Sequence, residues 1–321
     1  MALQAFLAAG KKGDPIVYVE LVGKKRALLF DCGEFHLTTA HMRKISDMCI
    51  SHTHMDHFVG FDRILRASLV DDKILTIHGP QGIIKNVCGK IASYTWNITD
   101  KLLLKIKVKE YDGKNVETIF MDSRNQFTIS KRTKKKDTSV VIDDDDIQVR
   151  YASCYHKIRS YAYSVKEKLF FNVRKDKLEE LKLEPGPWLA DLKNRARFST
   201  KYNEEIIVAQ KKYTVGFLKD ELLLRRSGTK ITFVVDVLFS PENIKKITKL
   251  AQKSSYFFCE TPFLEADLER ATETCHLTAK QAGILARQAN VHLFIPMHIS
   301  KRYKEVEPIL EEAKKEFGNI K

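Results

Sequence analysis

The sequence lacks several features that would place it in a particular class. Its six cysteines include no CxxC pair and are scattered along the chain, which favours buried free thiols in a reducing compartment over a disulfide framework. The start, MALQAFLAAGKK, has no basic segment ahead of its short apolar patch, and no apolar run approaches the length of a membrane-spanning helix. No repeat period is visible. We therefore expect neither a secreted disulfide scaffold, nor a membrane span, nor a solenoid, but a cytoplasmic enzyme or binding protein.

What is present is an excess of positive charge. Among 321 residues, 55 are lysine or arginine and 41 are aspartate or glutamate, which gives a net charge of +14. An excess of this kind favours a polyanionic partner, nucleic acid first and an anionic membrane surface second. Charge alone also permits a merely solubilising surface. The apolar content of 44% is sufficient for a sizeable core.

Short apolar segments of strand length alternate with segments of helical spacing. The helical patterns fall at about 241–253, 263–273, 278–289 and 304–317. This alternation predicts two sheets with helices outside them. The basic run KRTKKKD and the acidic run IDDDDI that follows it predict a solvated hairpin or loop.

Three histidines and one aspartate crowd into the stretch HTHMDH, directly after the apolar run DMCIS. Imidazole and carboxylate groups bind zinc, and also manganese or iron. Alternate residues of an extended loop project to one side, so His52 and His54 can reach one ion. Asp56 and His57 follow the turn into a helix and can reach a second. Because burying these groups without a metal would be costly, the stretch predicts half of a two-metal site.

The other half of that site must come from distant loops. His156, Asp236 and His298 each stand at the end of a predicted strand, where ligand-binding residues of layered α/β proteins are common. Isolated histidines are instead predicted to be surface residues or satisfied core residues: His36, His41, His78 and His292.

Several motifs resemble those of one enzyme family. HTHMDH resembles the HxHxDH signature of the metallo-β-lactamase superfamily, an αββα sandwich of two mixed sheets flanked by helices. HKIRSYAYSVKEK, which begins at His156, resembles the third-histidine motif of ribonuclease Z, the tRNA 3′-processing endonuclease, with Tyr163 as a further match. LEPGPWLADLK resembles the motif in that family's protruding arm through Gly186 and Pro187.

Two further motifs extend the resemblance to the C-terminus. CHLTAKQAGILARQA is similar to the His-Ser-Thr motif of ribonuclease Z, with His276 in place, and MHISKRY is similar to its closing His-x-Ser-x-Arg-Tyr motif. There are departures as well. FLAAGKKGDP stands where the family has a Gly-Thr-Gly turn. Departures also occur at Ala162, at Val237 and in the run Cys259-Glu260-Thr261-Pro262, where the family has His-Glu-Ala-Thr and only Glu260 matches.

The resemblance implies a metal-dependent enzyme that removes the 3′ trailer from precursor tRNA and leaves a tRNA 3′-hydroxyl and a 5′-phosphorylated trailer. It implies two zinc ions per subunit, replaceable by manganese or iron, that share an attacking hydroxide. One ion would be held by His52, His54 and His156, the other by Asp56, His57 and His298, with Asp236 between them.

Catalytic and substrate-binding roles follow from the same resemblance. Asp56 is the implied proton acceptor, and His276 would supply a proton to the ribose 3′-oxygen. We add the hypothesis that Glu260 orients His276 or raises its pKa, since a nearby carboxylate favours imidazolium. The residues predicted to contact the phosphate or the terminal nucleotides are Ser300, Arg302 and Tyr303.

We predict one metallo-β-lactamase-fold domain over 1–321 that carries an inserted basic arm at 166–201. DKLEELKLEPGPWLADLK predicts two short helices joined by a proline-glycine turn, and the surrounding cations would meet the tRNA backbone through its phosphates. The family resemblance also implies a homodimer and no membrane partner.

Three other functions remain open at this point. The first alternative is a small-molecule phosphodiesterase or arylsulfatase on the same fold, which the metal ligands cannot distinguish. The others are a non-catalytic RNA-binding relative and a DNA or mRNA nuclease of the superfamily, although that nuclease branch carries a large inserted domain. The arm and the net charge of +14 favour a tRNA substrate over a small molecule.

Overall fold

The computed structural model describes residues 3–168, 170–197, 199–226 and 228–321. The chain divides into two compact units. The larger consists of Ala2–Lys166 and Thr229–Lys321, and the smaller of Glu167–Gly228. The segment 166–201, expected to form an arm, thus overlaps the start of the smaller unit, which continues to Gly228.

One sheet of the larger unit has eight strands that pair in chain order. The strands are β1 (Leu3–Leu7), β2 (Val17–Leu21), β3 (Ala27–Phe30), β4 (Ile45–Cys49), β5 (Ile74–Pro80), β6 (Lys105–Tyr111), β7 (Asn115–Asp122) and β8 (Ile129–Lys136). The four central strands, β3 to β6, are parallel, and the outer pairs are antiparallel. A parallel centre places the C-terminal ends of β4 and β5 at the same edge, where the loop with HTHMDH begins.

The second sheet has six strands in the order β18-β17-β16-β11-β10-β9. These are β9 (Val140–Asp143), β10 (Ile147–His156), β11 (Ile158–Glu167), β16 (Lys230–Val234), β17 (Tyr256–Glu260) and β18 (Leu293–Met297). β16, β17 and β18 are parallel, and β11 pairs antiparallel with β16. Their C-terminal ends carry polar residues in the positions that the sequence predicts, at Asp236, Glu260 and His298.

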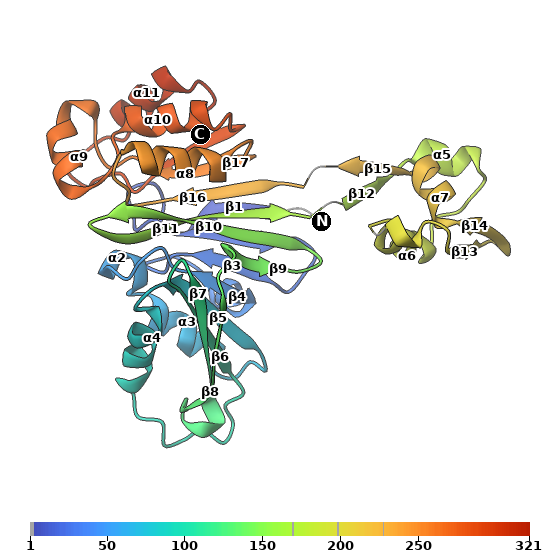
Figure 1. The fold of residues 1–321 in the computed structure, drawn as a ribbon, viewed down its shortest axis with the longest axis horizontal. Helices are drawn as coiled ribbons and strands as arrows, with labels where there is room; N and C mark the ends of the chain where they lie inside the picture. The colour runs from blue at the N-terminus through green and yellow to red at the C-terminus, as the bar shows by residue number, and fades with distance from the viewer. Residues whose placement is uncertain (1–2, 169, 198, 227) are drawn as a thin grey trace. The chain divides into compact units, whose positions relative to one another are not determined.

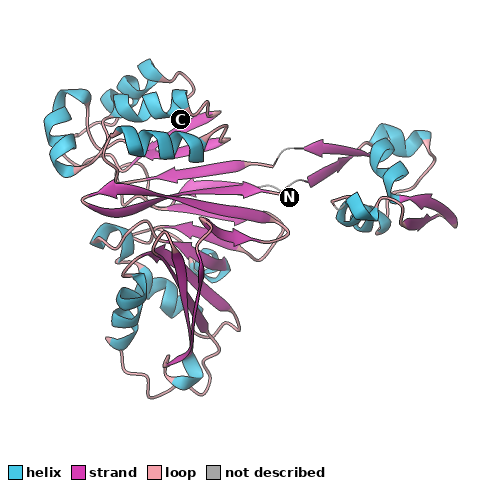
Figure 2. Ribbon diagram, in the orientation of Figure 1, coloured by secondary structure: helices cyan, strands magenta, loops and turns pink. Residues whose placement is uncertain are grey.

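Helices cover the outer faces of both sheets (Figures 1 and 2). The first half of the larger unit contains α1 (Thr39–Lys44), α2 (Met55–Phe58), α3 (Phe61–Ser68) and α4 (Ile83–Ala92), and the second half α8 (Pro241–Ala251), α9 (Leu268–Thr274), α10 (Ala279–Gln288) and α11 (Glu307–Glu316). Three apolar clusters separate the layers, one under each helical layer and one between the sheets. The predicted two-sheet sandwich flanked by helices is confirmed.

Local sequence explains where the helices near the C-terminal strands begin. Ser240 caps α8, whose first residue is proline, and a proline at that position sacrifices no helical hydrogen bond. Thr278 and Gln281 form a reciprocal capping box at the start of α10. Because both helices start immediately after loops of the second sheet, these caps fix the loops that carry Asp236 and His276.

The smaller unit has its own apolar cluster of buried side chains, including Leu192, Val215 and Leu222. Its elements are β12 (Phe170–Val173), α5 (Lys175–Glu180), α6 (Trp188–Arg195), β13 (Glu205–Val208), β14 (Lys211–Thr214), α7 (Val215–Leu222) and β15 (Leu223–Arg226). The two short helices predicted from DKLEELKLEPGPWLADLK are α5 and α6. A Cβ atom on Gly186 would lie 3.1 Å from the Trp188 ring, so glycine permits the close turn before α6.

The basic and acidic runs predicted to form a solvated hairpin or loop lie in antiparallel strands and a turn. KRTKKK belongs to β8, the exposed edge strand of the eight-stranded sheet, which pairs antiparallel with β7. The acidic run lies at the turn of the hairpin formed by β9 and β10. None of the helices in the described part of the chain is long and apolar enough to cross a membrane.

Candidate metal centre

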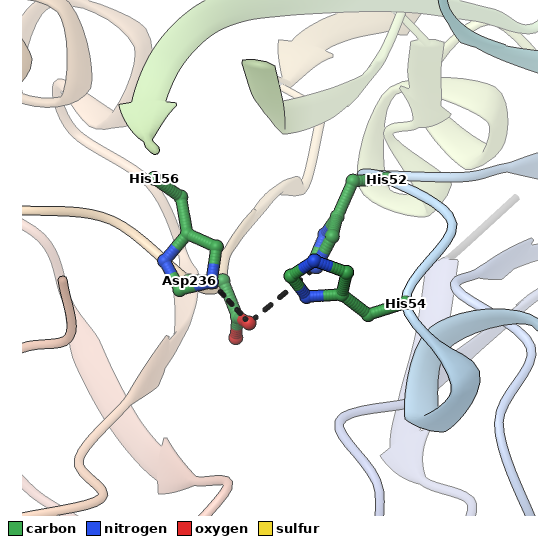
Figure 3. A group of neighbouring side chains, drawn as sticks. All are labelled: His52, His54, His156 and Asp236. Atoms are coloured by element: carbon green, nitrogen blue, oxygen red, sulfur yellow. Dashed lines mark ion pairs between the residues drawn. The ribbon is translucent and has the colours of Figure 1, made fainter. Parts of the chain in front are cut away.

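Loops that follow strands of both sheets bring four of the predicted ligands together (Figure 3). His52 and His54 lie on the loop after β4. His156 is the last residue of β10, and Asp236 follows β16. Their ligand atoms all lie within 4.8 Å of one another. Nε2 of His156 lies 3.2 Å from Asp236 Oδ2, and Nε2 of His52 lies 3.5 Å from the same oxygen, separations that suit ligands of one ion.

A second group shares Asp236 with the first. Asp56, His57 and His298 also place ligand atoms within 4.8 Å of one another. Nε2 of His57 lies 3.3 Å from Asp56 Oδ2 and 3.4 Å from Asp236 Oδ2. Nδ1 of His298 lies 3.2 Å from Asp236 Oδ1. The carboxylate of Asp236 therefore stands between two groups of ligands.

The unsatisfied atoms of this cluster are those that a metal would use. Nε2 of His52, Nε2 of His57, Nδ1 of His298 and Oδ1 of Asp236 are buried and have no hydrogen-bond partner. Buried polar atoms are normally paired, because leaving one unpaired costs about 1–3 kcal/mol. Four orphaned atoms in these two adjoining groups of ligands fit divalent cations better than a packed core.

Electrostatics at the cluster support the same interpretation. Burial, with the neighbouring His57, lowers the pKa of His52 to about 2, so this imidazole stays neutral, the form that binds metals. Burial opposes protonation of His57 and His298, yet the surrounding carboxylates, Asp236 foremost, together hold the pKa of both well above the usual value. The electrostatics of the cluster therefore favour a positive charge beside Asp236, and a bound cation would supply it.

Asp31 supports the cluster from behind and was missed in the sequence. Its Oδ2 accepts a hydrogen bond from Nδ1 of His57 at 2.7 Å and one from Ser51 Oγ at 2.7 Å. This contact fixes the ring so that Nε2 of His57 points at the ligand position. Asp31 follows β3 directly, so the strand-end position that marked Asp236 could have identified it.

Beside the metal cluster lies a histidine–carboxylate pair. Nδ1 of His276 lies 2.7 Å from Oε2 of the fully buried Glu260. Burial opposes protonation of His276, but Glu260 outweighs it and raises the pKa of the imidazole. Oε1 of Glu260 also accepts a hydrogen bond from the backbone N–H of Val237 at 2.9 Å. The predicted proximity of Glu260 and His276 is therefore present, and His276 can be a proton donor.

The backbone at the cluster has an unusual conformation. Asp31, Asp236 and His298 have φ angles of 56°, 49° and 56°, in the left-handed region that non-glycine residues rarely adopt. Strain of this kind gathers at functional sites, where the surrounding structure imposes it. Here the strained residues follow β3, β16 and β18, and the packed sheets hold them in place.

The loop after His298 holds the other predicted residues in different ways. Tyr303 OH contacts Asp267 and accepts a hydrogen bond from Leu264 N–H, and its ring packs on the core of the second sheet. Arg302 pairs with Asp267 at 3.2 Å. Their contact with substrate, and that of Ser300, stays a prediction.

The departures from the family motifs lie in packed positions. Ala162, Val237 and Cys259 are buried in the apolar cluster under α8 and α10. Pro262 offers its carbonyl to the backbone N–H of Ser300 at 3.3 Å. These substitutions therefore change the residues packed around the cluster and do not remove any of its ligand groups. Gly186 and Pro187 belong to the smaller unit.

The chain is similar to several known proteins in sequence and in fold. A protein named ribonuclease Z from Deinococcus radiodurans is 28% identical over 288 residues, which cover 87% of this chain and 84% of the relative. The metallo-β-lactamase fold protein YhfI of Bacillus subtilis has a TM-score of 0.56 and 12% identity, covering 99% of this chain and 95% of its own. The short form of human tRNase Z has a TM-score of 0.55 and 17% identity, with 93% and 94% covered. No family model matches the chain.

The sandwich of two sheets and its His/Asp cluster define this chain as a metallo-β-lactamase-fold protein with a site for divalent metal. Within that class, its sequence is similar over most of its length to proteins named ribonuclease Z. The resemblance that the motifs indicated is thereby confirmed.

Proposed function

We propose that this protein is a metal-dependent endoribonuclease that removes the 3′ trailer from precursor tRNA, leaving a tRNA 3′-hydroxyl and a 5′-phosphorylated trailer. The observation that carries the proposal is the position of the His276–Glu260 pair, 3.8 Å from the Asp236 carboxylate at the centre of the ligand cluster. A proton donor beside a metal cluster suits cleavage of a phosphodiester with a poor leaving group. Similarity to proteins named ribonuclease Z supplies the substrate.

The cofactor we propose is a pair of zinc ions, with manganese or iron as substitutes. His52, His54 and His156 would hold one ion, Asp56, His57 and His298 the other, and Asp236 both. When bound, two such cations supply an acidified water and neutralise charge on the phosphoryl oxygens.

The protein's own groups handle the protons. Asp56 is half-exposed at the mouth of the cluster and is the proposed acceptor of the proton from the attacking water. His276 is engaged through Nδ1, so its Nε2 is the atom that can protonate the departing ribose 3′-oxygen. Glu260 is a positioning residue, since it holds the ring and favours its protonated form.

Replacing Glu260 with glutamine tests that role. Because the amide keeps the shape but lacks the charge, we expect a roughly tenfold to hundredfold loss of kcat/KM on precursor tRNA with the metal content unchanged. An unchanged kcat/KM would show that Glu260 is merely structural.

The smaller unit is the proposed tRNA-binding arm of the enzyme. α5 and α6 flank the Gly186-Pro187 turn, and exposed lysines, among them Lys175 and Lys182, precede the turn in the chain. Exposed lysines suit contacts with the RNA backbone. We also propose a homodimer, which light scattering would test, and the cytoplasmic location expected from the sequence.

The decisive experiment is incubation of the purified protein with a 3′-extended tRNA, with and without a chelator, followed by mapping of the new ends. We expect a chelator-sensitive cut after the discriminator base. Hydrolysis of bis-p-nitrophenyl phosphate without any cut in the tRNA would favour the small-molecule alternative, which the comparisons do not favour.

A further inference from the structure

A second basic surface lies on the larger unit, outside the arm. Lys107 on β6 pairs across Phe120 on β7 with Lys131 on β8. Residues directly opposite on neighbouring strands share a face of the sheet, and so do alternate residues on one strand. Lys109 and Lys135 therefore lie on the same face. These four lysines are called the lysine face below.

Within the described parts of the chain, no ion pair joins any of the four ammonium groups of the lysine face to an acidic side chain. Nζ of Lys107 and of Lys131 instead lie 5.1 and 6.0 Å from the centre of the Phe120 ring. Burial, and after it the neighbouring Lys107, lowers the pKa of Lys109, whereas Asp47 acts in the opposite direction. Like charges gathered on one face of a sheet repel one another, and a bound anion would relieve that repulsion.

The lysine face is continuous with the hairpin that carries His156. Tyr111, the last residue of β6, accepts a hydrogen bond at its carbonyl from Tyr161 OH at 2.6 Å. The turn after it accepts another, from Arg159 to the carbonyl of Asp112 at 2.7 Å. Both donors belong to β11, whose preceding turn follows His156. In the same sheet, Lys109 pairs with His78 on β5, next to the strand that leads into HTHMDH. The strand that carries Lys107 and Lys109 is therefore linked, through buried residues at its C-terminal end, to the elements that carry the metal ligands.

We propose that the lysine face binds the phosphate backbone of precursor tRNA while the 3′ end of that RNA occupies the metal centre. The inference rests on the proposed function. Alternate residues of a strand are about 6.8 Å apart, so each ammonium can meet a different phosphate. Phe120 is half-buried and has lysines over its ring, so the face presents ammonium groups and little apolar surface. That favours a phosphate backbone over insertion into a membrane.

The test compares two double variants of β8. Lys131→Gln with Lys135→Gln removes two charges from the lysine face, whereas Lys134→Gln with Lys136→Gln removes two from the opposite face of the same strand. All four residues are exposed, and the net charge of the protein changes equally. Binding of a fluorescent precursor tRNA and of anionic phosphatidylserine vesicles is measured over a range of salt concentrations, with melting temperature and bound metal as checks on the fold.

We expect the first pair to weaken tRNA binding on the order of tenfold near 0.1 M salt and to reduce the slope of log K against log salt by about 1.4–1.8. The second pair should change binding less than twofold. Equal effects of both pairs, or no effect of either, would refute the inference, as would a loss confined to vesicles. If the wild-type protein binds the RNA through the lysine face but does not cleave it, the proposed function is refuted and the inference about the lysine face is supported. If the protein cleaves the RNA but its binding does not depend on the lysine face, the proposed function is supported and the inference is refuted.

Discussion

Two histidine–carboxylate clusters, one within the first sheet and one on the loops that follow strands of both sheets, differ in one respect. On β5, Nε2 of His78 donates to Asp47 of β4 at 3.0 Å, and Nδ1 accepts from Tyr111 OH at 3.0 Å. Both ring nitrogens are satisfied. In the metal cluster, His52 and His57 each leave Nε2 without a partner.

The difference teaches how to distinguish a structural histidine from a ligand. His52, His57 and His78 are all almost inaccessible to water, so burial alone does not distinguish them. A satisfied histidine has no capacity left for a ligand, whereas an orphaned one costs free energy until something binds it. Equivalent substitutions in the two clusters should therefore have different effects: those in the metal cluster should reduce metal binding, and those at His78 and Asp47 should leave it intact.

The largest contrast should come from Asp236→Ala. Removing the carboxylate shared by both ligand groups should abolish stoichiometric metal binding and lower kcat/KM on precursor tRNA by roughly a thousandfold or more. Elemental analysis and end-mapped cleavage are the measurements. Asp47→Ala is the matched control and should retain its metal. Retention of full metal by the Asp236 variant would contradict the assignment.

Removal of metal should lower the free energy of unfolding through the metal cluster and not through the cluster of His78 and Asp47. At a free metal concentration of 100 times Kd, binding to the native state contributes about 2.7 kcal/mol to the free energy of unfolding, which a chelator removes. Denaturant unfolding with and without chelator measures this difference. The Asp236→Ala protein should show no response to chelator, and a response as large as that of the wild type would place the metal elsewhere.

A smaller effect is expected at Asp31, which contacts the cluster through His57 and Ser51. Asp31→Asn keeps the volume but loses the charge that aims His57, so the metal affinity should fall about 10- to 100-fold. Competition with a coloured chelator measures the affinity. If the affinity were unchanged, the contact would be structural only.

The smallest effect belongs to the satisfied cluster. His78→Asn should cost about 1–3 kcal/mol of unfolding free energy through lost hydrogen bonds, with metal content intact. Burial lowers the pKa of His78 in the folded state, so its stabilising contribution is present above the unfolded value near 6.5 and diminishes as pH falls. The stability difference between wild type and variant should therefore narrow from pH 7.5 to pH 5.5, and a difference that widened would contradict this account.

A feature of the fold or of the site could be predicted from the sequence where neighbouring residues alone determine it. HTHMDH can be recognised as a ligand motif because its histidines and aspartate lie within six positions. His156, Asp236 and His298 can be identified because strands and helices are predicted from local patterns, and these residues lie at strand ends. Asp31 was missed although it too follows a strand directly, because only the fold shows that it lies behind His57. For the basic run, composition left hairpin and loop open, and the pairing with β7 decides that it is a strand.

The left-handed backbone at Asp31, Asp236 and His298 limits how this site can be redesigned. Branched side chains such as valine, isoleucine and threonine resist that conformation, whereas asparagine accepts it more readily than most. A library that seeks a new metal preference would therefore do well to vary His52 or His156 freely and to offer only asparagine, aspartate, histidine or glycine at the strained positions. In this protein the main chain, as much as the choice of ligand, restricts the coordination chemistry that mutation can reach.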